Sequence, residues 1–124
     1  SAGAFLMEDG TLLGADGNTN IYIEAKGNLY GVLQHRNHIT IMSAAPVFTN
    51  RSVVFDFSTD ADTLYGGTNS VVPVGANHWG MIPGDADGDG RITPVDRMIV
   101  TQQMGKTGYL AGDLNLDGVV NDED

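Results

Sequence analysis

The chain has 124 residues, of which 41% are hydrophobic, and this length suits one small domain or one domain with an appendage. Its formal net charge of −10, from 16 acidic against 6 basic residues, argues against nucleic acid and anionic membrane surfaces as partners. It has no cysteine, so disulfides give no evidence on its compartment, and no apolar run long enough to predict membrane insertion.

The first two thirds of the chain have the pattern of short strands separated by turns. Acidic, asparagine and glycine residues mark the turns, as at residues 8–10 and 15–18. Seven short strands with turn signals about every 8–12 residues favour an antiparallel β-sandwich. The strands are expected at residues 4–7, 11–13, 20–24, 28–33, 39–42, 52–57 and 70–74.

A His-Arg-Asn-His run at residues 35–38 raises the question of a metal or acid–base site. His35 and His38 are three residues apart, which on one strand places them on opposite faces, so they are not expected to converge on one ion. No third ligand and no serine or cysteine nucleophile pairs with them in the sequence. The favoured interpretation is polar side chains that bind loops at the end of a sheet.

One segment, residues 94–104, has a helical pattern. Pro94 suits the first turn of a helix, and Gly105 suits its end. The residues that recur with helical spacing are Val95, Met98, Ile99 and Gln102. The predicted fold class is therefore mainly β, with a small α element near the C-terminus.

A first loop, residues 85–96, carries carboxylates at loop positions 1, 3, 5 and 12 and glycine at position 6. Calcium takes six to eight oxygen ligands, and a 12-residue loop with this spacing can surround it. A solvated acidic turn has similar composition, but it does not explain why Ile92 and Asp96 also fall in register. The predicted calcium ligands are the side chains of Asp85, Asp87, Asp89 and Asp96, the backbone carbonyl of Arg91, and a water held by Thr93.

The pattern recurs in a second loop, residues 113–124. Position 12 is aspartate in both loops, where calcium sensors of the helix–loop–helix type carry a bidentate glutamate. The second loop has Asn115 in place of a carboxylate, so we expect it to bind more weakly than the first loop. Its predicted calcium ligands are Asp113, Asn115, Asp117, Val119 and Asp124.

Each loop is preceded by a glycine, Gly84 or Gly112, rather than by an amphipathic helix. With the duplicated loops, this arrangement resembles dockerin modules, which are calcium-binding loop–helix repeats of extracellular bacterial proteins. The resemblance covers residues 84–124 and lacks the second dockerin helix. It implies that residues 1–83 form the β-sandwich module and residues 84–124 a dockerin-like calcium module.

A second resemblance runs through residues 30–47, the Phe-Asp-Phe run at residues 55–57 and the Trp-Gly-Met run at residues 79–81. These residues look like a β-sandwich module of Bacteroidetes-type secreted proteins, which precedes dockerin-like repeats. The resemblance implies a secreted or cell-surface bacterial protein and carries no catalytic role. Two short patterns, at Asn50 and Thr63, are possible N- and O-glycosylation sites.

These observations favour a non-enzymatic extracellular calcium-binding structural module. Compared with the resembled families, the chain lacks a strand at its start and a helix at its end. Two interpretations of that difference stay open: a repeating subunit of a surface fibre, with copies of itself as partners, and chain ends set by proteolysis. The alternative is a dockerin that anchors a secreted protein to a cohesin-type partner. A glycosidase with paired carboxylates is disfavoured, because calcium geometry accounts for the carboxylate clusters.

Overall fold

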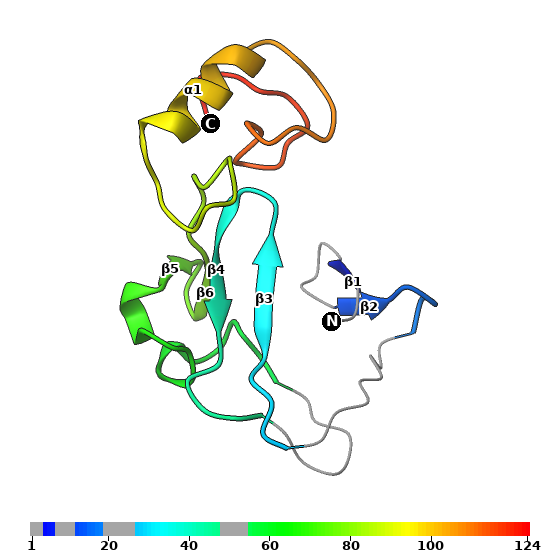
Figure 1. The fold of residues 1–124 in the computed structure, drawn as a ribbon, viewed down its shortest axis with the longest axis vertical. Coiled ribbons are helices and arrows are strands. Elements are labelled where there is room, and N and C mark those ends of the chain that lie inside the picture. Colours follow the sequence, from blue (N-terminus) through cyan, green and yellow to red (C-terminus); the bar gives the residue numbers. More distant parts are fainter. Residues whose placement is uncertain (1–3, 7–11, 19–26, 48–54) are drawn as a thin grey trace.

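The computed structural model describes residues 4–6, 12–18, 27–47 and 55–124. Within these ranges, the chain forms short antiparallel strand pairs and one α-helix (Figure 1). The strands are β1 (Ala4–Leu6), β2 (Leu12–Gly14), β3 (Val32–His35), β4 (His38–Met42), β5 (Val71–Val74) and β6 (His78–Met81). The helices are α1 (Pro94–Gln103) and two single 3₁₀ turns, η1 (Ala61–Thr63) and η2 (Gly67–Asn69).

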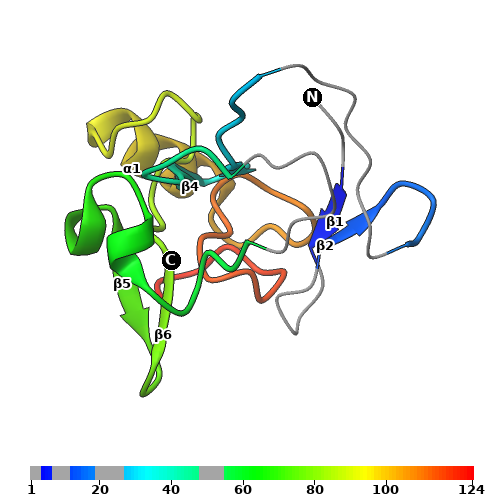
Figure 2. The same ribbon diagram turned by 90° about the horizontal axis from the view of Figure 1, so that it is seen from below.

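The pairs are β1–β2, β3–β4 and β5–β6, each a separate two-stranded sheet in the described part of the chain. In Figures 1 and 2, β5–β6 and β1–β2 lie on opposite sides of the molecule. Short antiparallel strands agree with the predicted mainly β class, whereas their packing as two layers of a sandwich stays a prediction.

Several strand boundaries differ from those that the sequence predicts. The strand expected at residues 28–33 begins only at Val32, and residues 55–57 are not a strand, although their alternation predicted one. The rest of that predicted strand and the one at residues 20–24 lie outside the described residues. Strand β6 was not expected because Trp79 and Gly80 interrupt any apolar alternation. It forms because residues 71–74 pair with it.

The β3–β4 hairpin occupies the centre of the molecule. It pairs Val32 with Met42 and Leu33 with Ile41, and its turn falls between His35 and His38. On its other side, β4 meets the segment that follows β6, where the Ile39 amide donates to the Ile82 carbonyl at 2.8 Å. This pairing brings the start of the first loop beside the tip of the hairpin.

A small apolar core lies against β4. Its buried members are Ile41, Ala61, Leu64 and Val71, and the partly buried side chains that pack on it are Leu33, Phe55, Phe57, Trp79 and Met81. Complete burial of one such aliphatic side chain contributes about 1.5–3 kcal/mol. The core therefore holds strand β4 of the hairpin in place.

Helix α1 begins as its sequence predicts and is one residue shorter at its end. Thr93 is the N-cap, with its Oγ1 accepting from the Val95 amide at 3.2 Å, and Pro94 occupies the first turn. Asp96 completes a capping box by accepting from the Thr93 amide at 2.7 Å. In the described part of the chain, no helix has the length and apolar character needed to cross a bilayer.

Candidate metal centre

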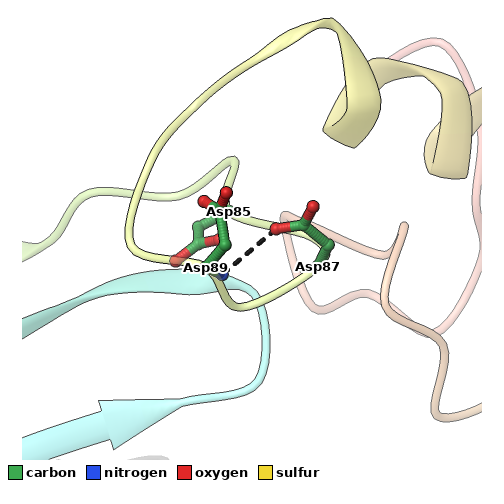
Figure 3. Close-up of side chains that lie close together, drawn as sticks. All are labelled: Asp85, Asp87 and Asp89. Atoms are coloured by element: carbon green, nitrogen blue, oxygen red, sulfur yellow. Dashed lines mark hydrogen bonds between the residues drawn. The ribbon is translucent and has the colours of Figure 1, made fainter.

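Three carboxylates of the first loop converge between β6 and α1 (Figure 3). Asp85, Asp87 and Asp89 each offer an oxygen, and these oxygens lie within 4.8 Å of one another. Asp85 is 2% exposed, whereas Asp87 and Asp89 are exposed. Such a group of carboxylates could hold a metal ion, since a cation offsets the repulsion between them.

Backbone amides of the loop itself hold these carboxylates in place. The Gly90 amide donates to Asp85 Oδ2 at 3.0 Å, the Asp89 amide to Asp87 Oδ1 at 3.1 Å, and the Arg91 amide to Asp89 Oδ1 at 2.8 Å. Gly90 has φ +84°, a conformation that glycine adopts without steric cost. The loop therefore turns its backbone donors inward and fixes the direction of each carboxylate.

Asp96, at position 12, closes the first loop from the opposite side. Its Oδ1 accepts from the Asp87 amide at 3.2 Å, and its Oδ2 accepts from the Thr93 amide at 2.7 Å. The Thr93 amide is the main cause that lowers the pKa of Asp96, and the amides of Asp87 and Ala86 add to it against the effect of burial. Asp96 therefore stays ionised and joins the end of the loop to its beginning.

The second loop reproduces this frame bond for bond. All five bonds described for the first loop recur between the same loop positions. The first three are from the Gly118 amide to Asp113 Oδ2 (3.2 Å), from Asp117 to Asn115 Oδ1 (2.9 Å) and from Val119 to Asp117 Oδ1 (2.8 Å). The other two join the amides of Asn115 (3.1 Å) and Asn121 (2.8 Å) to the carboxylate of Asp124. The sequence repeat is thus a structural repeat.

Both loops bury one carboxylate oxygen that has no hydrogen-bond partner. These atoms are Asp85 Oδ1 and Asp113 Oδ1, both at position 1, on residues that are each 2% exposed. An unpartnered buried oxygen on a carboxylate is costly, by about 1–3 kcal/mol or more. A bound cation removes this cost. The predicted side-chain ligands are four carboxylates in the first loop and three carboxylates with the Asn115 amide in the second. Oxygen ligands of this kind suit hard ions such as Ca²⁺ and Mg²⁺.

The two loops differ in two details. Leu116, at position 4 of the second loop, has φ +67°, where the first loop has Gly88 with φ +74°. A side chain in this left-handed region is strained by about 1–2 kcal/mol. In addition, Arg36 Nη2 lies 3.4 Å from Asp113 Oδ2 and offsets part of the negative charge at position 1. Both features agree in direction with the expectation that the second loop binds more weakly.

The rings of His35 and His38 lie close together, whereas their spacing on one strand predicted opposite faces. Their Nδ1 atoms lie 3.1 Å apart, and each is within hydrogen-bond distance of Asn37 Oδ1, at 3.0 and 2.8 Å. The expectation was wrong because a turn separates them, so they are cross-strand partners rather than members of one strand. Burial is the main cause that lowers the pKa of both rings, and the nearby Arg36 charge adds to it.

The remaining predicted residues are placed as follows. Thr93 Oγ1 contacts the Val95 amide and Asp96 Oδ2, at 3.2 Å each, so its predicted part in holding a water stays a prediction. Thr63 is exposed in η1, with its Oγ1 donating to the Asp60 carbonyl at 2.7 Å. Asn50 lies outside the described residues. No family model, curated protein or solved structure gives a significant match to this chain.

Proposed function

We propose that this chain is a non-enzymatic extracellular structural module whose two loops each bind one calcium ion. The observation that carries the proposal is the pair of orphan buried oxygens, Asp85 Oδ1 and Asp113 Oδ1, at the same position of two loops with the same bonding frame. Calcium is favoured over magnesium because a 12-residue loop supplies many oxygens from one flexible segment, whereas Mg²⁺ retains several waters.

The role of the ions is to rigidify residues 84–124. In the described part of this region, α1 is the single regular element and the remainder is turns held by carboxylate–amide bonds. Residues 84–124 also contain 9 of the 16 acidic residues (Asp85, Asp87, Asp89, Asp96, Asp113, Asp117, Asp122, Glu123 and Asp124). Without cations, repulsion among these groups opposes closure, and with them the region becomes a stiff unit.

The second part of the proposal is assembly into a fibre of identical chains. Among the described strands, none pairs with the second edge of β3, and Val32 on this strand is 57% exposed. An open edge with apolar side chains accepts a strand from another chain. When one copy donates to the next, head-to-tail contacts generate open filaments. Such a subunit resembles the secreted β-sandwich module with dockerin-like repeats described above.

The second candidate function is that of a dockerin that binds a cohesin-type partner. The observation that favours it is the exposed apolar face of α1, where Val95 is 46% and Met98 is 51% exposed. A pull-down with cohesin-type domains distinguishes the two functions. Capture that is lost in a Val95→Ser/Met98→Ser variant supports the dockerin, whereas filaments without capture support the fibre subunit.

Calcium titration by isothermal calorimetry tests the first part of the proposal, with Asp62→Asn as a matched control. Asp62 is an exposed carboxylate in η1, outside both loops. We expect Asp89→Ala to abolish or strongly weaken one site and Asp62→Asn to leave both sites intact. Removal of calcium with a chelator should expose residues 84–124 to proteases before residues 27–47. An unchanged melting curve and cleavage pattern after chelation would refute the structural role.

A further inference from the structure

A single residue of the β3–β4 turn holds the first residues of both loops. Asn37 is fully buried, with 0% exposure. Its backbone carbonyl accepts from the amides of Gly84 and Asp85, at 3.1 and 3.2 Å, at the start of the first loop. Its side-chain Nδ2 donates to the carbonyls of Ala111 (3.2 Å) and Asp113, at the start of the second loop. Asn37 therefore contacts both residues that carry the orphan oxygens.

The chemistry of asparagine is required at this position. Nδ2 faces two carbonyl acceptors, so the amide oxygen must face the rings of His35 and His38. That oxygen accepts from both rings when each carries its proton on Nδ1. Aspartate would have no donor for the two carbonyls, and alanine would leave them without partners. All the hydrogen-bonding groups of the Asn37 side chain are thus engaged.

The neighbouring Arg36 contacts the second loop and the residues just before it, but not the first loop, in the bonds described. Its Nε donates to the Leu110 carbonyl at 3.2 Å, its Nη2 lies 3.4 Å from Asp113 Oδ2, and its guanidinium stacks 3.7 Å above the Tyr109 ring. Arg36 therefore strengthens the contact between the turn and the second loop. By contrast, Asn37 contacts the first residues of both loops, Asp85 and Asp113.

We infer that Asn37 is a positioning residue that couples the two calcium sites, so that the ions bind with positive cooperativity. This inference rests on the proposed function of the loops. The first ion fixes the backbone of its own loop at position 1 and thereby orders Asn37. The Asn37 amide donor then already faces the carbonyls at the start of the second loop. Binding of the second ion therefore costs less ordering entropy. Coupling between sites of this kind typically changes affinity about 5- to 150-fold.

The test is a thermodynamic cycle measured by calcium titration calorimetry on the whole chain. One loop is disabled by Asp89→Ala or by Asp117→Ala, and the affinity of the other loop is compared with its affinity in the unaltered chain. We expect disabling the first loop to weaken the second about tenfold, within the usual range of such couplings. In the Asn37→Ala background, the same disabling step should change the affinity less than twofold.

The ratio of affinities separates coupling from general support of the fold. A merely structural role of Asn37 lowers the affinity of each loop by a factor that does not depend on the state of the other loop, which leaves the ratio unchanged and overturns the inference. If the Asn37→Ala variant does not fold, the measurement on the chain with Asn37 still tests the inference. Two sites that bind calcium independently in that chain would overturn the coupling. Absence of calcium binding at both loops would instead refute the proposed function itself.

Discussion

Substitution of Asp85 by asparagine should change stability in opposite directions with and without calcium. The substitution keeps an oxygen to accept from the Gly90 amide, which donates to Asp85 Oδ2 at 3.0 Å. It replaces the orphan oxygen by an amide nitrogen, which repels a cation, and it removes one charge from the group of three carboxylates. The substitution therefore stabilises the empty loop by removing charge repulsion, and it destabilises the calcium-bound loop by removing a ligand.

The magnitude follows from the spacing of the three carboxylates. Two unit charges at 4.8 Å, the upper limit of the separations among these oxygens, repel by about 0.9 kcal/mol at an effective dielectric constant near 80 and by about 3.5 kcal/mol near 20. Asp85 takes part in two of the three pairs, and the exposure of Asp87 and Asp89 favours the lower value. We therefore expect a gain of about 2 kcal/mol without calcium. With calcium at about 1,000 times the dissociation constant, one bound ion contributes about 4.1 kcal/mol. Its loss therefore outweighs the gain and leaves a net destabilisation of about 2 kcal/mol.

Thermal denaturation monitored by circular dichroism provides the assay, with the chain in chelator and in excess calcium. A change of 1 kcal/mol corresponds to about 4 °C for a chain of this size, so the two shifts should be several degrees and of opposite sign. The exposed Asp62→Asn substitution should shift the melting temperature little in both buffers. A shift of the same sign in both buffers, or none, would refute the assignment of Asp85 as an ion ligand.

Three further predictions concern the second loop, the hairpin tip and assembly. Leu116→Gly should raise the melting temperature in calcium, because it relieves part of the left-handed strain of about 1–2 kcal/mol. Gly88→Ala should lower the melting temperature, because φ is +74° there although no atom lies within 4 Å. Equal effects of the two substitutions would contradict this prediction. Because burial and the Arg36 charge lower the pKa of His35 and His38, the unfolded chain binds more protons, and stability should fall as the pH drops below about 6.5, as measured by melting at pH 7.5 and 5.5. A His35→Gln/His38→Gln variant with the same pH dependence would disprove that explanation. Electron microscopy at high protein concentration with calcium should show filaments, and discrete monomers would argue against the fibre.

The two loops could be predicted from sequence because the residues that form each loop lie within 12 consecutive positions at fixed spacing. The same spacing appears in the structure as five side-chain to backbone bonds per loop, including those of Asp96 and Asp124 at position 12. The helix could be predicted for a similar local reason, since Pro94 and Gly105 mark its ends. In each case the determining interactions are short in sequence.

The junction at the hairpin tip could not be predicted in the same way. The contacts of Arg36 and Asn37 with residues 110–113 span 74 to 77 positions of sequence, and no periodic pattern reports them. The approach of His35 to His38 depends on a turn at residues 36 and 37, which contains neither glycine nor proline. This turn is positioned by pairing with the chain segment that follows β6. Strand β6 itself has no alternating pattern that would have predicted it.

The most direct measurement is the number of calcium ions bound per chain at equilibrium, determined by calorimetry on the intact protein. We expect two ions for the unaltered chain, one for Asp85→Asn or Asp113→Asn alone, and none for the two substitutions combined. These are the residues with the orphan buried oxygens. Zero ions in the unaltered chain, or two ions in the combined variant, would contradict the assignment of the loops as calcium sites.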